Sequence, residues 1–296
     1  MARIPVGWKR RLLPIWNGGH RLAWRVGDYA EAIRNRRFEH CIVCGRAGPI
    51  LYRRWIIPPR LEELWGLSPR VAEALARKES SQCAWCGASL RARRLALVLL
   101  ETYPVGTPPA PAHSVVEWAR HPEARALRVA EINLIEGLHA ALRGLPGHIA
   151  SDYQEGPGAG GLASEDLTRL TYPDAAFELI LTSETLEHVP DFGLALRELH
   201  RVLAPGGRHL FTVPLMPGVP ETFARTVILP DGRLDHRAPP LFHPGGDVGY
   251  RVFTEFGADL PVLLHRAGFE VTIHFGPTTE DDLAQVFDCR KPPASA

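Results

Sequence analysis

Residues Asp166–Val213 read DLTRLTYPDAAFELILTSETLEHVPDFGLALRELHRVLAPGGRHLFTV. Phe177–Leu181 is an almost continuous apolar run, as a strand buried on both faces requires. Apolar residues then recur at helical spacing from Phe192, behind Asp191 as a capping residue, and a Pro-Gly-Gly sequence is expected to stop this helix. His209–Val213 is the next predicted strand. Strand, helix and strand in this order predict a parallel pair with a right-handed crossover.

The same alternation continues on both sides of this stretch. Upstream, Leu127–Ile132 and His148–Asp152 are predicted strands, with a helix at Glu136–Arg143 between them. Downstream, apolar residues at helical spacing over Phe256–Ala267 predict a helix that Thr254 caps. The expected fold class is therefore α/β, a doubly wound, mostly parallel sheet of the Rossmann-like kind, preceded by a small helical module.

The composition is that of a globular protein. Of 296 residues, 45% are hydrophobic and 23% charged, which excludes a disordered or fibrous chain. The apolar runs are far shorter than the roughly 20 residues that span a bilayer, and the basic N-terminus lacks the apolar segment of a secretory signal. We expect a cytoplasmic protein without a membrane span.

Charge and proline content divide the chain. Residues 1–100 carry 19 Lys and Arg against 7 Asp and Glu, a net charge of +12, whereas the remainder carries 15 against 26, a net charge of −11. The simpler interpretation is that the two parts attract and pack; the other is that the basic part contacts a polyanion. Tyr103–His113 holds four prolines and reads as a connector. We predict three parts: an N-terminal helical arm with a metal-binding module (1–102), a linker with a lead-in helix (103–125) and the α/β domain (126–296).

A Cys-x-x-Cys-Gly motif occurs twice, at residues 41–45 and 83–87. Two such turns complete a tetrahedral site of four thiolates, which suits a structural zinc ion without an open coordination position. The 38 residues between the pairs exceed the usual spacing, so an insertion with a helix at Leu61–Lys78 must bulge out. Redox or disulfide use is the competing interpretation, which a cytosolic chain disfavours; Cys289 reads as a core thiol. The predicted zinc ligands are Cys41, Cys44, Cys83 and Cys86.

Polar residues follow the predicted strands at the edge where a doubly wound sheet binds ligands, outside the carboxyl ends of its strands. Asp152 ends one strand with an acid that suits two vicinal ribose hydroxyls. In the loop that follows, the Asp166 carboxylate and the Leu167 amide could read the edge of an adenine.

These residues resemble a known family. Asp166–Val213 is similar to the central block of class I S-adenosylmethionine-dependent methyltransferases, and the similarity extends more weakly over about Ala126–Arg290. The two Cys-x-x-Cys-Gly turns, here called knuckles, precede this domain. In this respect the chain resembles the subset of these enzymes with an N-terminal zinc-ribbon module. The motifs that carry the resemblance are Leu170-Thr171-Tyr172-Pro173-Asp174, Phe177-Glu178-Leu179-Ile180, Leu186-Glu187-His188-Val189 and Leu203-Ala204-Pro205-Gly206-Gly207.

The resemblance implies S-adenosylmethionine as cofactor. An acid after the first strand and the turn behind it would hold the amino acid part, the acid after the second strand the ribose, a loop acid with the next amide the adenine, and the end of the fourth strand the methionine side. By this resemblance the amino acid part would contact Glu131, Asn133 and Gly137, and the ribose Asp152 and Tyr153. The adenine would contact Asp166 and Leu167, and the methionine side Ser183 and Glu184.

The turn after the first strand departs from the family. It usually holds two or three glycines, since a Cβ would block the approach of the backbone to the cofactor. Here residues 131–137 read EINLIEG, with only Gly137 kept. Asn133 can adopt positive φ more easily than Leu134 or Ile135, and Glu136 adds a negative charge. The missing G-x-G-x-x-G pattern also disfavours a hydride-transfer enzyme.

Methyl transfer is an in-line displacement that depends on proximity, and an oxygen or carbon nucleophile also needs a base. An insertion after the fifth strand carries His243, our first candidate for a base or acceptor contact, and His236, the second. Such an insertion could form a lid over the acceptor. His188 is the third candidate, although a packing role suits its Glu-His dipeptide as well, and His236 and His243 could equally be surface residues.

Three functions remain open at this stage. The first is a methyltransferase for a small molecule, such as a sugar or a secondary-metabolite intermediate, with zinc supporting the acceptor site. The second is an RNA methyltransferase whose basic module binds phosphates, although no aromatic-basic RNA motif lies near the knuckles. The third is a non-methylating scaffold or S-adenosylmethionine-binding protein with a degenerate turn. The oligomeric state is left open.

Overall fold

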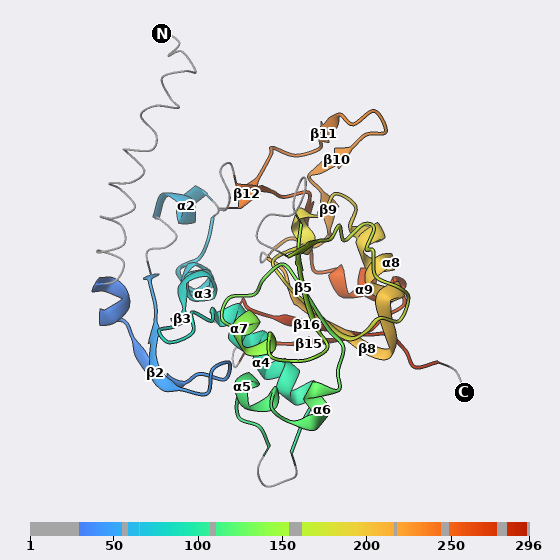
Figure 1. The fold of residues 1–296 in the computed structure, drawn as a ribbon. Helices are drawn as coiled ribbons and strands as arrows, with labels where there is room; N and C mark the ends of the chain where they lie inside the picture. The colour runs from blue at the N-terminus through green and yellow to red at the C-terminus, as the bar shows by residue number, and fades with distance from the viewer. Residues whose placement is uncertain are drawn as a thin grey trace, which may run out of the picture.

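The computed structural model describes residues 30–54, 59–64, 66–106, 111–153, 162–215, 218–243, 249–276 and 283–294. A seven-stranded mixed sheet forms its centre (Figure 1), in the order β15-β16-β8-β7-β4-β5-β6. Five strands are parallel, and β16 pairs antiparallel with both β8 and β15. The strands are β4 (Val129–Ile132), β5 (His148–Asp152), β6 (Ala163–Ser164), β7 (Phe177–Ser183), β8 (Leu203–Thr212), β15 (Glu270–His274) and β16 (Val286–Arg290). The predicted doubly wound α/β fold is thereby confirmed.

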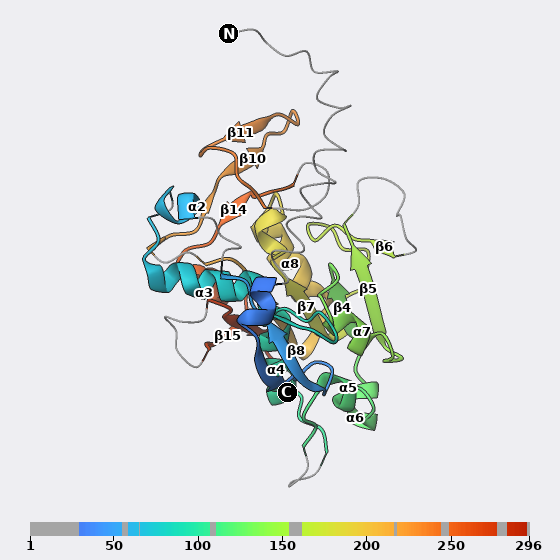
Figure 2. The same ribbon diagram turned by 90° about the vertical axis from the view of Figure 1, so that its left-hand side faces the viewer.

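Helices cover both faces of this sheet (Figure 2). Alternate side chains along each strand enter two separate cores, as the period of two in a strand requires: Leu179 faces one core and Ile180 the other. One core includes α8 (Phe192–Val202) and α9 (Leu260–Arg266). The other includes α4 (Leu90–Thr102), α5 (Val115–Trp118), α6 (Pro122–Arg125) and α7 (Leu138–Leu142).

The N-terminal segment is built into the second of these cores. Cys41 and Val43 are buried in it together with Leu95 of α4 and Leu210 of β8. The segment also contains a three-stranded sheet and two further helices, which precede α4. These are β1 (Arg37–His40), β2 (Ala47–Leu51), β3 (Gln82–Cys83), α2 (Pro59–Leu64) and α3 (Pro69–Ser80).

An insertion between β8 and α9 rises above the carboxyl ends of the parallel strands (Figure 1). It consists of short antiparallel pairs. The segment that leads back to the domain is tied to it by the Phe253 amide, which donates to the Glu187 carbonyl over 2.8 Å. Its elements are β9 (Phe223–Ala224), β10 (Thr226–Ile228), β11 (Leu234–His236), β12 (Phe242–His243), β13 (Tyr250–Arg251) and β14 (Thr254–Glu255), and η2 (Leu186–His188) is a 3-10 turn beneath it.

Several local predictions are confirmed and others are wrong. Asp191 caps α8 by accepting a 2.8 Å hydrogen bond from the Leu194 amide. The Pro-Gly-Gly sequence at 205–207, however, does not stop that helix, which ends at Val202. It lies inside β8 as a bulge, because the pairing with β7 jumps there from Leu203 to Arg208.

Two predicted helices have different bounds. The single helix expected at Leu61–Lys78 is two, α2 and α3, because Ser68 starts the second by accepting from the Val71 amide and a proline follows it. Thr254 caps nothing: it lies in β14, and α9 begins only after Asp259. Within the described residues, no helix is long and apolar enough to cross a membrane.

Candidate functional site

Asn133 ties together the ends of three parallel strands. Its backbone amide donates to the Ser151 carbonyl (2.9 Å). Its side-chain nitrogen donates to Thr185 Oγ1 (3.2 Å), and its side-chain oxygen accepts from the backbone amide of Tyr153 (3.4 Å). Its φ of +63° is the left-handed conformation expected for it, and in the turn only Gly137 shares a positive φ. The loop thus follows its path without placing Leu134 or Ile135 in strained conformations.

Glu131 is completely buried beneath this turn. Its Oε1 accepts from the Ile135 amide (2.8 Å), and its Oε2 lies 2.8 Å from His139 Nδ1 and 3.1 Å from His148 Nε2. Both oxygens therefore already have protein partners, and the carboxylate fixes the turn from within.

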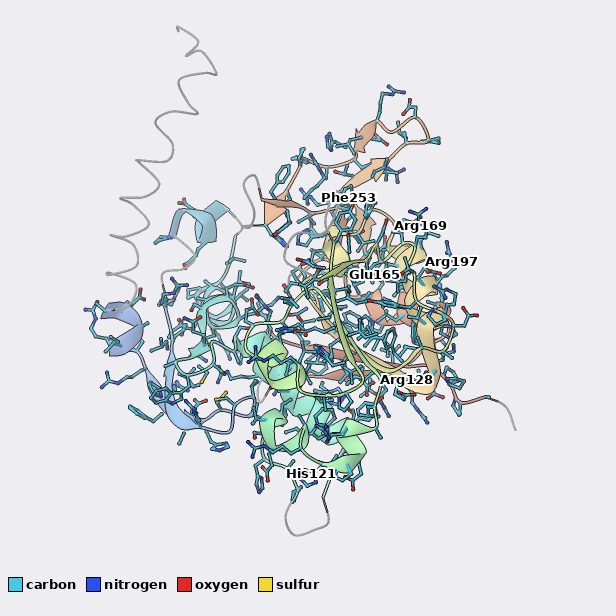
Figure 3. All side chains as sticks on the ribbon, viewed as in Figure 1. His121, Arg128, Glu165, Arg169, Arg197 and Phe253 are labelled. Atoms are coloured by element: carbon cyan, nitrogen blue, oxygen red, sulfur yellow. The ribbon has the colours of Figure 1, made fainter. Side chains whose placement is uncertain are left out.

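Asp152 ends β5 half-buried, and the neighbouring Tyr153 is exposed. The Asp152 carbonyl accepts from the Glu165 amide (3.1 Å), which brings the loop with Asp166 to the same edge. Asp166 Oδ1 accepts from Thr168 N (2.8 Å) and Thr168 Oγ1 (2.7 Å), and Leu167 is buried behind it. Figure 3 shows Glu165 toward this end of the sheet and Arg128 toward the opposite one.

Glu184 follows β7 and has a φ of +48°. Its backbone amide donates a hydrogen bond to the Thr212 carbonyl (2.9 Å), and the Oγ of the preceding Ser183 lies 2.9 Å from Thr212 Oγ1. The side chain of Glu184 points to the N-terminal segment. Its Oε2 lies 3.0 Å from Nζ of Lys78, a residue of α3 that is 1% exposed. Burial acts to raise the pKa of Glu184, but attraction from Lys78 and Arg91 outweighs it and the pKa is lowered. The N-terminal segment therefore supplies a cation to this end of the strands.

The four predicted zinc ligands come together. Their sulfurs all lie within 4.8 Å of one another, with Cys41 Sγ 3.8 Å from Cys86 Sγ and Cys44 Sγ 3.9 Å from Cys83 Sγ. Four bonds of about 2.3 Å to one zinc ion would place tetrahedral sulfurs about 3.8 Å apart, whereas a disulfide needs about 2.05 Å. A hydrogen bond from the Cys86 thiol lowers the pKa of Cys41.

The two knuckles are the same turn built twice. The amides of Gly45 and Gly87 donate to the carbonyls of Cys41 and Cys83 over 2.8 and 2.9 Å, and the two glycines have φ of +72° and +73°. The positive φ explains the repeated glycine. The residues present thus fit a zinc ion.

The second knuckle lies directly on the turn after β4. A Cβ on Gly137 would come within 2.7 Å of the Ala88 nitrogen and 2.8 Å of the Cys86 carbonyl oxygen. Glu136 points to the same segment, with Oε1 3.8 Å from Arg91 Nη2 and Oε2 3.5 Å from Ser89 Oγ. The negative charge that Glu136 adds to the turn therefore faces the basic N-terminal segment.

Gly137→Ala is expected to destabilise the protein by about 1–3 kcal/mol, because φ +72° is strained for alanine and the knuckle must shift. Gly144→Ala is the matched control, since nothing lies within 4 Å of its Cβ position. Thermal unfolding of both variants measures the difference, and equal melting temperatures would contradict the close packing described here.

The predicted histidines separate into two places. His188 and His243 lie together, with ring centroids 4.9 Å apart, and each has a nitrogen 3.6 Å from Glu187 Oε1. His236 lies apart from them on β11, where its Nδ1 is 3.0 Å from Thr226 Oγ1.

Four residues near these sites were not singled out from the sequence. Lys78 and Arg91 reach the strand ends from the N-terminal segment, and His139 and His148 surround Glu131. Only His148 carried a local signal, as a polar residue at the start of a predicted strand; the others depend on long-range contacts.

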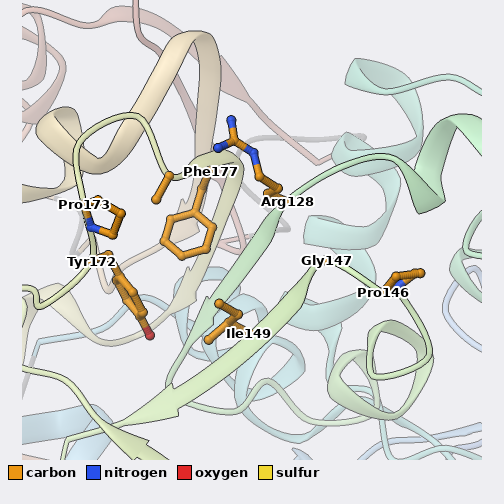
Figure 4. A pocket seen from close by; sticks show the side chains of 8 residues that line it. Arg128, Pro146, Gly147, Ile149, Tyr172, Pro173 and Phe177 are labelled. Carbon is orange, nitrogen blue, oxygen red and sulfur yellow. The ribbon is translucent and has the colours of Figure 1, made fainter.

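A shallow pocket of about 320 Å³ lies elsewhere, at the amino ends of the parallel strands (Figure 4). Arg128, Gly147 and Phe177, each at the start of a strand or just before it, line it together with Tyr172 and Ile149. Doubly wound sheets bind ligands at the other end, so this pocket is not the candidate site.

Residues 146–211 match the family model described as "Methyltransferase domain". The match covers β5 to β8 and most of the stretch that carries the resemblance. This match confirms the resemblance to methyltransferases over that segment, and the sheet order above agrees with the fold that the resemblance implies.

Individual proteins are similar over parts of the chain. The 27-O-demethylrifamycin SV methyltransferase of Amycolatopsis mediterranei (strain S699) is 46% identical over 43 residues, 14% of this chain and 16% of that protein. The ubiquinone/menaquinone biosynthesis C-methyltransferase UbiE of Hydrogenovibrio crunogenus (strain DSM 25203 / XCL-2) is 29% identical over 122 residues, 36% of this chain and 48% of that protein. This chain thus spans less than half the length of each of these curated relatives.

Among solved structures, a similar one is the Burkholderia thailandensis 1,6-didemethyltoxoflavin-N1-methyltransferase with bound 1,6-didemethyltoxoflavin and S-adenosylhomocysteine. It is 17% identical with a TM-score of 0.42, covering 86% of this chain and all of that one.

Proposed function

We propose that this protein is an S-adenosylmethionine-dependent methyltransferase that acts on a small molecule. The observation that carries the proposal is the position of Asn133, Asp152 and Glu184 at the carboxyl ends of the neighbouring strands β4, β5 and β7, where Asn133 contacts Tyr153 and Thr185. The segment that holds Asp152 and Glu184 matches a methyltransferase domain. The carboxyl ends of these strands form the edge at which doubly wound sheets bind nucleotide-like ligands.

The residues at this edge fit the cofactor. The half-buried Asp152 carboxylate suits the ribose hydroxyls, Asp166 and Leu167 the adenine, and the turn from Asn133 to Gly137 over Glu131 the amino acid part. Glu184 Oε1 is buried and has no hydrogen-bond partner within the described residues, while its Oε2 binds Lys78. Such an acceptor suits a ligand's ammonium group, because an unpaired buried oxygen is costly.

When bound, S-adenosylmethionine supplies a methyl group on a positively charged sulfur. The chain's part is to orient the two reactants in line, to exclude water and to accept a proton from the acceptor where its nucleophile is an oxygen or carbon. Ser183 and Glu184 would border the methionine side. The insertion that carries His236 and His243 would cover the acceptor, and His243 lies beside Glu187 and His188, which follow β7.

A small-molecule acceptor is favoured by two observations. The two curated relatives are named for demethylrifamycin and for ubiquinone/menaquinone biosynthesis. Three basic side chains of the described N-terminal residues also form ion pairs within the molecule: Arg54 pairs with Glu62, Arg93 with Glu39 and Lys78 with Glu184. Of these pairs, Lys78–Glu184 joins the basic part to the acidic part, which supports packing between them over contact with RNA phosphates.

The direct test is isothermal titration of the full chain with S-adenosylmethionine and with S-adenosylhomocysteine. Micromolar binding is the expected result, after which acceptors can be screened. Binding of neither compound would overturn the proposal and favour a scaffold with a degenerate turn. Strong binding without transfer to any acceptor would point to another use of the cofactor.

Asp152→Ala is expected to weaken cofactor binding by about 1–3 kcal/mol, the cost of losing charge-assisted hydrogen bonds to the ribose. Asp174→Ala is the control: that carboxylate is exposed and pairs with Arg201 near the opposite end of the strands. The same titration measures both variants. An affinity of Asp152→Ala equal to the wild type would show that the crevice is misassigned.

A further inference from the structure

Glu187 carries a buried carboxylate that accepts no hydrogen bond from the part of the chain that the structure describes. Its side chain is 0% exposed, and neither Oε1 nor Oε2 has a hydrogen-bond partner within the described residues. An ionised carboxylate in this position is costly unless a cation or hydrogen-bond donors compensate it. In the part of the chain that the structure describes, no lysine or arginine nitrogen lies within 4.0 Å of it; its only ion-pair neighbours are His188 and His243.

The two histidines present nitrogens to this carboxylate at a spacing that is too long for a hydrogen bond. His188 Nε2 and His243 Nδ1 each lie 3.6 Å from Glu187 Oε1, beyond the usual 2.7–3.2 Å range. The three ligand atoms lie within 4.8 Å of one another. Bonds of about 2.0–2.2 Å to one tetrahedral ion would place its ligands about 3.4 Å apart, so 3.6 Å suits a shared metal ion.

The other ring nitrogen of His188 has the partner that metal-binding histidines use. Its Nδ1 lies 2.7 Å from the Arg251 carbonyl oxygen. A carbonyl can only accept, so Nδ1 carries the proton, and in the neutral ring Nε2 has its lone pair directed at Glu187. A metal-ligating histidine commonly donates its second N–H to a carbonyl in this way.

The cluster of Glu131, His139 and His148 has the same composition and a different geometry. There the histidine nitrogens lie 2.8 and 3.1 Å from Glu131 Oε2, and Oε1 accepts from the Ile135 amide. Hydrogen bonds satisfy that carboxylate, so nothing there calls for a cation. The contrast shows that a buried carboxylate between two histidines need not be left without hydrogen bonds.

We propose that Glu187, His188 and His243 bind a divalent transition-metal ion, a second metal site distinct from the four cysteines. Two imidazoles and a carboxylate suit zinc and neighbouring ions of the first row. Three protein ligands leave a coordination position for water or an oxygen of a substrate. Since Glu187 and His188 lie on η2 and His243 on β12, the ion would also tie the insertion to the end of β7.

The test uses the full chain with one equivalent of zinc on the cysteines, titrated with Co²⁺. We expect one Co²⁺ per chain, with visible absorption typical of nitrogen and oxygen ligands and without the thiolate-to-cobalt charge-transfer band. Glu187→Gln and His243→Ala should each weaken this binding at least about tenfold, since even the partners behind metal ligands contribute 10–100-fold. His265→Ala, an exposed histidine on α9, should bind as the wild type does.

Circular dichroism checks that the variants fold, and His243→Ala serves as the principal variant because its ring is partly exposed. Wild-type protein that binds no Co²⁺ beyond the cysteine site would overturn the proposal. So would a His243→Ala variant with unchanged Co²⁺ binding. The readout needs neither cofactor nor acceptor, so its outcome is independent of the proposed methyl transfer.

Discussion

Cys83→Ser is expected to release zinc and to destabilise the whole protein, not only its N-terminal segment. Cys83 lies in the same core as Leu179 and Leu210 of the central sheet, so loss of the knuckle opens one face of that sheet. Loss of a metal is among the few causes that exceed about 4 kcal/mol. For a domain of this size, that corresponds to a drop in melting temperature of roughly 8–16 °C.

The measurement combines zinc content by elemental analysis with thermal unfolding. Cys289→Ala is the matched control, because it removes the remaining cysteine, which is buried on the other side of the sheet, and should retain one zinc on the cysteine site. Wild-type protein that is folded as purified and holds no metal on these cysteines would refute the zinc assignment. A Cys83→Ser variant that loses zinc and keeps its melting temperature would show that the ion is not structural.

Lys78→Met is expected to lower the free energy of unfolding by about 3–5 kcal/mol, the usual cost of removing one partner of a buried ion pair. Lys78 is 1% exposed and lies 3.0 Å from Glu184, whose carboxylate is left without this partner in the variant. The affinity for the cofactor should change as well, because Glu184 belongs to the proposed methionine side. Chemical denaturation and isothermal titration measure the two effects.

Arg77→Met is the control on the same helix. Its guanidinium is more than a third exposed and pairs with Glu73 one turn away, an arrangement worth about 0.3–0.5 kcal/mol. The double variant Lys78→Met/Glu184→Gln should recover much of the lost stability, since replacing both partners removes the unpaired charge. A double variant as unstable as Lys78→Met would show that the loss comes from packing.

The pH dependence of this pair has a definite sign. The pKa of Glu184 is lowered in the folded protein from its ordinary value of 4.5, so the pair stabilises the fold above that value and the stabilisation is lost as the pH falls through the folded pKa. The difference in unfolding free energy between wild type and Lys78→Met should therefore be full at neutral pH and shrink in acid.

Local signals in the sequence predicted the sheet well. The bounds of β5 match the prediction, and the capping Asp191 begins α8 where expected, because apolar period and helix caps depend on near neighbours. The two Cys-x-x-Cys-Gly turns were also predicted, because each is determined by residues close in sequence. The bulge at Pro-Gly-Gly was not predicted, since it depends on the pairing of β8 with β7.

Contacts between distant residues escaped prediction. The partner of Glu184 is 106 residues away, and nothing in the sequence around Lys78 distinguishes it from a surface lysine. Glu187 was visible as part of a common dipeptide, but its missing hydrogen bonds appear only once η2 is folded against the insertion. The roles of the predicted cofactor-binding and acid–base residues remain predictions. The division of the chain at residues 102 and 126 is also still a prediction.

The docking of α4 has a consequence for the order in which the protein is made. This helix packs in one core with Val286 of the last strand, and Arg94 donates to the Phe275 carbonyl. A ribosome completes α4 well over a hundred residues before β16 exists, so the part of its apolar face that β16 covers stays exposed until that strand is made. The knuckles can close on zinc during that time, because all four cysteines emerge before α4.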